Sequence, residues 1–258
     1  MKEQFYHHCF ALDQVENGDK VPVGGGFIGS KDMPYSVEAD FETFFDRVSG
    51  PADTYLQTLR KDESRNFFAQ TYAGVPYDFA TVAQAFSGVI EGKRKNQSTN
   101  EFARSTLYRN HPDQTPKLSE IFKANHAMCV EFALLAKRYL DSHGIKSQLM
   151  SGEFIQRVND DGVNFPDPHT FLLVEAKGKE FVYDPTIPVL NDQGTALASI
   201  LVPAVSFRSV SERLKSEPTM IACKNLASGS TRYYGVGDMA NVLPENLISR
   251  PEDPALSG

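Results

Sequence analysis

The feature that most constrains the fold is a long amphipathic helix that is followed along the chain by an antiparallel hairpin. Apolar residues recur at helical spacing from Met128 to Leu140, and Gly144 marks the helix end because glycine readily takes the left-handed conformation that closes a helix. Two strand-like runs at 169–175 and 180–184 flank a Lys-Gly-Lys turn. This order predicts a helix, buried along one face, that packs on an antiparallel sheet.

The first half of the chain has a different pattern. Residues 1–35 are rich in turn residues, which favours loops and short strands, whereas residues 37–86 have helical spacing and predict two or three amphipathic helices. Pro51 stands where a further helix could start, and the polar run 91–98 is typical of an exposed connection. The first of these predicted helices has one apolar stripe, formed by Phe41, Phe44, Phe45 and Val48.

These patterns together predict an α+β protein in three parts. Residues 1–110 form a mainly helical N-terminal extension, residues 111–242 form the core with the helix and hairpin, and residues 243–258 form a disordered tail.

Composition excludes several classes of function. The 258 residues include 26 Lys and Arg against 33 Asp and Glu, a net charge of −7 without a basic stripe, so we expect no nucleic-acid partner. Three widely spaced cysteines argue against a disulfide framework and a zinc ribbon, which favours a reducing compartment. No apolar run approaches the length of a membrane span. We expect a cytoplasmic protein, or one that a signal-less route secretes into a host cytosol.

Three residues of the predicted core have the chemistry of a thiol enzyme. Asn125 is a candidate N-cap that would place Cys129 in the first helical turn, where the helix dipole favours a thiolate. His169 begins one strand of the hairpin and Asp184 ends the other, which predicts that they are cross-strand neighbours. An aspartate in that position would orient the imidazole and stabilise its charged form.

The same segments resemble a known family. The run from Asn125 to Ala133, Asn-His-Ala-Met-Cys-Val-Glu-Phe-Ala, is followed by Gly144-Ile145, by His169-Thr170-Phe171 and by Tyr183-Asp184-Pro185-Thr186. This pattern is similar to that of the transglutaminase-like superfamily of papain-like enzymes, over roughly residues 120–190 of the chain.

The resemblance implies a papain-like, transglutaminase-like core in which Cys129 is the nucleophile, His169 the general base and Asp184 the orienting carboxylate. Family members often have glycine or an aromatic residue beside the cysteine, whereas Met128 and Val130 flank it here, so only backbone N–H groups at Cys129 can be assigned to an oxyanion hole.

The implied reaction begins with attack on an amide of a protein or peptide substrate, and it needs no cofactor and no metal. Hydrolysis would make the chain a protease or glutamine deamidase, as in bacterial effectors that modify host proteins. A transglutaminase-type acyltransferase and a non-catalytic protein-binding module of the same fold are the alternatives.

Other candidate residues favour structural interpretations. Glu131 is interpreted as a helix residue with a supporting partner, and Cys223 as a structural cysteine. Two formal motifs lack the context that their function needs: the glycines Gly24, Gly26 and Gly29, and the cluster His7, His8 and Cys9. Three histidines are interpreted as surface or capping residues: His111, His126 and His143.

Overall fold

The predicted long helix is α7, which runs from Cys129 to Ser142 in the computed structural model of the chain. The structure describes residues 10–23, 35–61, 72, 74–98, 101–113, 115–158, 163–190, 196–203, 219–224 and 231–236. Ten of the fourteen residues of α7 are buried, so the helix is enclosed nearly all round rather than along one face as predicted. Elements from both halves of the chain cover it, which a helical pattern alone does not reveal.

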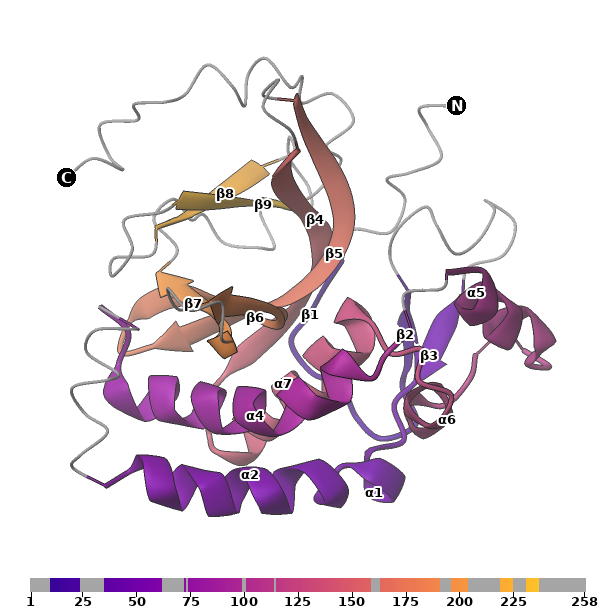
Figure 1. Ribbon diagram of the computed structural model, residues 1–258, viewed down its shortest axis with the longest axis horizontal. Coiled ribbons are helices and arrows are strands. Elements are labelled where there is room, and N and C mark those ends of the chain that lie inside the picture. Colours follow the sequence, from indigo (N-terminus) through magenta and orange to yellow (C-terminus); the bar gives the residue numbers. More distant parts are fainter. Residues whose placement is uncertain are drawn as a thin grey trace.

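The sheet that packs on α7 is antiparallel throughout its described strands. Its strands follow the order β7-β6-β5-β4-β9-β8, and β1 pairs with β4 beside β9 (Figure 1). The strands are β1 (Phe10–Leu12), β4 (Ser147–Val158), β5 (Val163–Ala176), β6 (Lys179–Leu190), β7 (Ala196–Pro203), β8 (Thr219–Lys224) and β9 (Thr231–Val236).

Helices from the first half of the chain cover the other side of α7. Helix α4 packs against α7, β6 and β7, and α2 packs against α4 as an outer layer (Figure 1). A small sheet of two strands lies beside α5 and α6. These elements are β2 (Lys20–Pro22), β3 (Ser36–Glu38), α1 (Phe41–Phe44), α2 (Asp46–Leu59), α4 (Tyr77–Lys95), α5 (Glu101–Asn110) and α6 (Leu118–Lys123). The mixture of helices with an antiparallel sheet agrees with the predicted α+β class.

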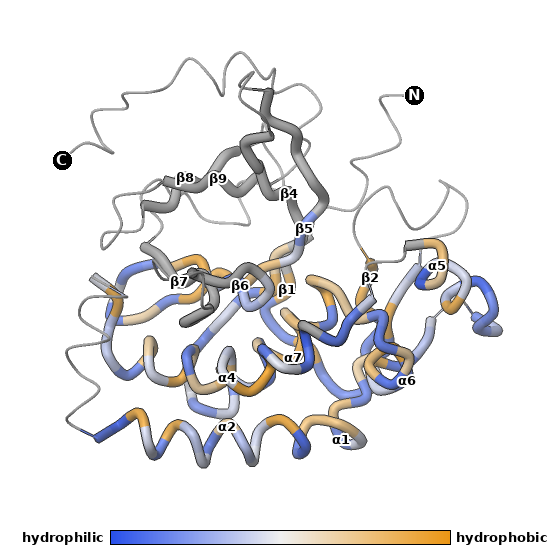
Figure 2. The backbone as a smooth tube through the Cα atoms, in the orientation of Figure 1, coloured by the Kyte–Doolittle hydropathy of each residue, from blue (hydrophilic) through white to orange (hydrophobic). Residues whose placement is uncertain are grey.

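A single cluster of buried apolar residues joins the two halves. It includes Val48 and Phe86 from the N-terminal helices together with Phe132 of α7 and Phe181 of β6. Hydrophobic and hydrophilic stretches alternate along α2, as expected of an outer helix with one buried face (Figure 2). The core therefore continues across residue 110, and the domain boundary there stays a prediction.

The C-terminal end of the predicted helix and the turn of the predicted hairpin have the expected backbone conformations. After α7, Gly144 has a φ of 72°, and Ile145 N donates to Leu140 O at 3.0 Å, which is the Schellman closure of a helix. Between β5 and β6, Lys177 and Gly178 have φ values of 52° and 70°, as in a tight hairpin turn. The predicted helix stop and hairpin are confirmed.

Three local predictions about the first half are wrong. Residues 36–38 are a strand rather than part of a helix, because Val37 is fully buried and pairs with Val21. Pro51 lies inside α2 instead of starting a helix, and Thr54 Oγ1 bonds to Gly50 O nearby at 3.0 Å. The run 91–98 is not simply a connection, because α4 continues to Lys95 and keeps Ile90 in the core.

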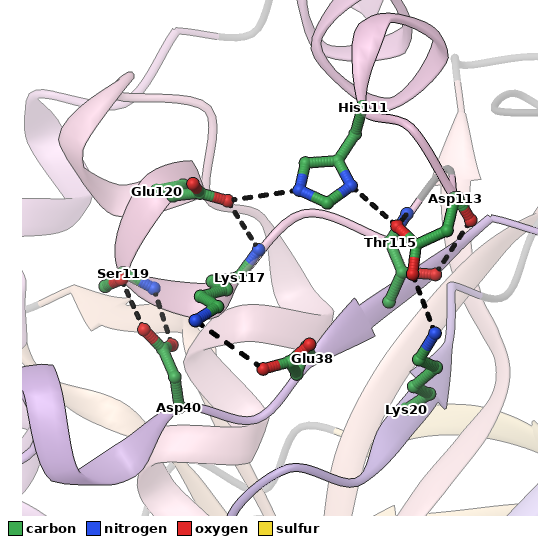
Figure 3. A network of polar contacts seen from close by, with 9 residues as sticks. All are labelled: Lys20, Glu38, Asp40, His111, Asp113, Thr115, Lys117, Ser119 and Glu120. Carbon is green, nitrogen blue, oxygen red and sulfur yellow. Dashed lines mark hydrogen bonds and ion pairs between the residues drawn. The ribbon is translucent and has the colours of Figure 1, made fainter.

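A network of polar contacts supports α6, the helix before Cys129 (Figure 3). Asp40 accepts hydrogen bonds from the backbone N–H and the hydroxyl of Ser119 in the first turn of α6. His111 lies 2.7 Å from Asp113 through Nδ1 and 3.6 Å from Glu120 through Nε2. The contacts of Asp40 hold the first turn of α6 against the segment that precedes α1.

The end of α7 provides a stability test with an internal control. We expect Gly144→Ala to lower the free energy of unfolding by about 1 kcal/mol, because a Cβ strains the left-handed backbone. We expect Gly92→Ala, inside α4, to raise it by about 0.5–1 kcal/mol. No atom lies within 4 Å of the Cβ at either position, so packing does not confuse the comparison. Urea unfolding measures both, and equal effects would contradict the assigned conformation of Gly144.

Candidate active site

Cys129 is the first residue of α7, so it lies nearer to the N-terminus of the helix than the sequence predicted. Met128, not Asn125, precedes the helix. Asn125 has a φ of 57° and belongs to the turn that ends α6, where a left-handed asparagine is a common helix terminator. The correction strengthens the electrostatic argument, because the backbone N–H groups of the first helical turn have no partner within the helix and their partial positive charge favours a thiolate.

His169 and Asp184 come together on the hairpin, although not as direct cross-strand neighbours. The ladder of β5 and β6 pairs Leu172 with Tyr183, and its continuation sets Asp184 opposite Phe171. His169 points to the same face as Phe171, so it lies diagonally from Asp184. Imidazole Nε2 lies 2.7 Å from carboxylate Oδ2. The predicted register was displaced by two residues, because the turn is centred between Lys177 and Gly178, one position later than predicted.

The Asp-Pro-Thr segment holds the carboxylate in place. Thr186 donates to Asp184 Oδ1 from its backbone N–H at 2.9 Å and from its hydroxyl at 2.6 Å. The pairing of β6 with β7 is irregular between Asp184 and Pro188, which is a bulge that redirects the strand. Arg94 of α4 donates to the carbonyl of Thr186 at 2.7 Å, so a helix of the N-terminal half supports the bulge.

Asp184 is fully buried, yet it is held as a carboxylate. Burial alone would raise its pKa, but the charge and hydrogen bond of His169 and the bonds from Thr186 lower the pKa below its ordinary value. A buried carboxylate with three donors can therefore stabilise a protonated imidazole.

The thiol of Cys129 and the imidazole of His169 are close enough that each shifts the pKa of the other. Burial opposes the charge on both groups. His169 nevertheless lowers the pKa of Cys129, whereas Asp184 and Cys129 together raise the pKa of His169 to about 10. Both shifts favour a thiolate and imidazolium pair at neutral pH. Because Nε2 faces Asp184, the nitrogen left for the thiol is Nδ1.

A buried ionic cluster lies under the first turn of α7. Glu131 is fully buried, and its Oε1 accepts from Arg104 Nη2 at 2.5 Å and from the Tyr108 hydroxyl at 2.9 Å. Its Oε2 accepts the backbone N–H of Met128 at 2.7 Å. The interpretation of Glu131 as a helix residue with a supporting partner agrees with these contacts. Arg104 and Tyr108 were missed, although their spacing by four residues places them on one face of α5.

The loop before Cys129 is fixed by a side-chain amide. Gln97 Oε1 accepts the backbone N–H of Ala127 at 2.7 Å, and its Nε2 donates to Lys93 O at 3.0 Å. Both ends of this amide are thus engaged, which fixes its orientation beside the loop. The backbone N–H of Cys129 is the donor that the helix start offers to an oxyanion.

The other sequence candidates have varied outcomes. His143 follows α7 as its C-cap, as predicted, and bonds to Asp53 at 2.9 Å. His111 lies at the surface end of α5 and pairs with Asp113. Cys223 lies in β8. Six candidates lie outside the described residues: His7, His8, Cys9, Gly24, Gly26 and Gly29.

Within the described ranges, no helix is both long and apolar enough to cross a membrane. Among the same residues, no three His, Cys, Asp or Glu side chains gather in a way that could hold a metal ion.

Comparison with known proteins adds no relative. No protein-family model, no curated protein and no solved structure matches this chain. Its function therefore has to be inferred from the residues of the site themselves.

The ion pair is testable by the rate at which iodoacetamide alkylates Cys129. We expect the rate to rise with a midpoint below pH 8.5, the ordinary value for a free thiol. His169→Ala should lower the rate at pH 6.5 by about tenfold or more, because burial without the imidazolium disfavours the thiolate. Asp184→Asn should also disfavour the thiolate, but less than His169→Ala does. Its midpoint should therefore lie above that of the wild type and below that of His169→Ala.

Peptide mapping by mass spectrometry separates Cys129 from Cys9 and Cys223 in this assay. His111→Asn is the matched control, because it removes a histidine bonded to an aspartate away from the thiol. A midpoint at or above the free-thiol value in the wild type would contradict the ion pair.

The cluster under α7 predicts a strong coupling between two buried charges. We expect Glu131→Gln to lower the free energy of unfolding by about 3–5 kcal/mol, because Arg104 keeps its charge without a partner. The double variant with Arg104→Met should recover part of this loss. Additive effects in a double-mutant cycle measured by urea unfolding would exclude the coupling.

Proposed function

We propose that this chain is a cysteine-dependent hydrolase that acts on amide bonds of protein substrates, as a protease or a glutamine deamidase. One observation carries the proposal: Cys129 begins a buried helix, its pKa is lowered by His169, and His169 in turn bonds to a buried Asp184. A thiol, a base and an orienting carboxylate in this order are the parts of a nucleophilic mechanism.

In the first step, the Cys129 thiolate attacks the carbonyl carbon of the amide. Negative charge develops on the carbonyl oxygen, and the backbone N–H of Cys129 can stabilise it at the positive end of α7. The imidazolium of His169 then gives its Nδ1 proton to the leaving nitrogen, the C–N bond breaks, and a thioester remains on Cys129.

In the second step, water attacks the thioester. Neutral His169 takes a proton from the water through Nδ1 while the C–S bond breaks, and the thiolate and imidazolium pair is restored. Asp184 stays ionised throughout, because the two donors of Thr186 and its partner His169 stabilise the carboxylate. Its role is to hold the ring so that Nδ1 faces the sulfur.

The sequence resemblance supports the same assignment. The pattern around Cys129, His169 and the run Asp184-Pro185-Thr186 is similar to the transglutaminase-like superfamily, and we propose a papain-like core on that basis. The start of a helix at the cysteine and an antiparallel hairpin with the histidine and aspartate are what such a core needs.

The experiment incubates the protein with a mixture of unfolded proteins and a biotin-tagged primary amine. Mass spectrometry then reads three products: new peptide termini, glutamate in place of glutamine, and incorporated amine. We expect one of the first two products. Cys129→Ala should abolish it, and His169→Ala should lower its rate by about a hundredfold or more, which is the ordinary contribution of general acid and base catalysis.

Each other outcome has a definite meaning. Amine incorporation above hydrolysis would replace the hydrolase with an acyltransferase. Absence of all three products, together with a Cys129 thiol that reacts no faster than a free cysteine, would overturn the enzyme proposal in favour of a binding module. His111→Asn serves as the control that should keep full activity.

A further inference from the structure

A pocket of about 640 Å³ opens between α2, the end of α4 and α6. Its lining is mostly polar and includes two aromatic rings. Phe44 and Phe122 stack there with ring centres 4.8 Å apart and planes tilted by 17°. Lys93 Nζ lies 5.2 Å from the centre of the Phe44 ring, so a cation–π contact holds the ammonium group over this ring.

The pocket concentrates positive charge in an acidic protein. Arg47, Lys93 and Lys123 line it, and in the part of the chain that the structure describes none of them forms an ion pair. The single carboxylate of the lining is Glu120, which is turned toward other partners (Figure 3). Its Oε2 accepts from the backbone N–H of Lys117 at 2.9 Å and lies 3.6 Å from His111 Nε2.

Unpaired cations in a recess act together on an anion. The concave wall has lower polarisability than water, so the fields of three cations add there more effectively than on a flat surface. The lining also offers side-chain amide and hydroxyl groups that can donate hydrogen bonds, from Asn96, Asn125 and Thr43. An extended carboxylate-bearing ligand therefore fits the chemistry of this pocket.

The pocket wall continues into the loop that carries the nucleophile. Gln97 and Asn125 line the pocket, and Gln97 also accepts the backbone N–H of Ala127, two residues before Cys129. Asn125 is four residues from Cys129, a stretch that spans at most about 14 Å of extended chain. A peptide bound in the pocket could thus place a residue about four positions away at the thiol.

We propose that this pocket, formed by Arg47, Lys93, Lys123 and the stacked Phe44 and Phe122, binds an acidic segment of the protein substrate beside the residue that reacts. The inference rests on the proposed function, because it names the class of substrate for that site. Polypeptide fits better than nucleic acid, since Phe122 is buried beneath Phe44 and the chain has no basic stripe beyond the pocket.

The test measures binding without turnover, in the Cys129→Ala background. The probe is a fluorescent peptide with a central glutamine and a run of four glutamates on one side, compared with the same peptide carrying four lysines. Fluorescence anisotropy gives the dissociation constants. We expect the acidic peptide to bind at least tenfold more tightly, and we expect its affinity to fall as salt is raised from about 0.05 M to about 0.5 M.

Charge reversal identifies the pocket. Lys93→Glu and Arg47→Glu should each weaken binding of the acidic peptide by about tenfold or more. Lys179→Glu is the matched control, because it changes the net charge equally at an exposed position on the hairpin, outside the pocket. Circular dichroism confirms that each variant is folded. Equal effects of Lys93→Glu and Lys179→Glu would overturn the proposal.

Three further outcomes are decisive. Tighter binding of a single-stranded oligonucleotide, lost in Lys93→Glu, would replace the acidic peptide with nucleic acid. Binding that follows the expected pattern while the wild type modifies no protein would contradict the hydrolase and leave the pocket in place. A reactive hydrolase that binds both peptides equally would contradict the pocket alone.

Discussion

The enclosure of α7 is the constraint on which the site depends. Ten of its fourteen residues are buried, between the sheet on one side and α4 on the other. A helix held by dispersion contacts on every side has little freedom to rotate or slide. Cys129 is therefore placed by the packing of residues such as Phe132 and Tyr139, which never contact a substrate, and the N-terminal helices are as necessary to the site as the sheet.

Burying charged groups in such an enclosed core costs desolvation free energy. In this chain the buried charges alternate in sign, so that neighbouring groups offset this cost. Cys129, His169 and Asp184 follow one another, and the pKa of each is shifted in the direction that favours its charged form. Beside them, Arg104 favours the thiolate while Glu131 opposes it, so their effects on Cys129 oppose each other. Glu131 also accepts the backbone N–H of Met128. The main effect of the cluster is therefore to position the start of α7, rather than to change the charge near Cys129.

The sequence predicted features that depend on neighbours along the chain. The stop at Gly144 and the hairpin turn at Gly178 each follow from a few residues, and so does the approach of His169 to Asp184. Features that depend on distant segments were missed. Burial around α7, the bonding of Arg104 to Glu131 and the continuation of α4 beyond residue 91 arise from contacts between elements, which periodicity does not encode. The helix start was misplaced because asparagine is favoured both before a helix and after one.

The hairpin has a consequence for how the site assembles. The contact of His169 with Asp184 joins two strands of one tight hairpin, so it closes over a short loop and forms with local structure. The contact of His169 with Cys129 joins that hairpin to a helix and forms only when α7 is packed on the sheet. The acidity of the thiol is thus a property of the assembled core, and Cys129 serves as a built-in chemical reporter of whether helix and sheet have docked.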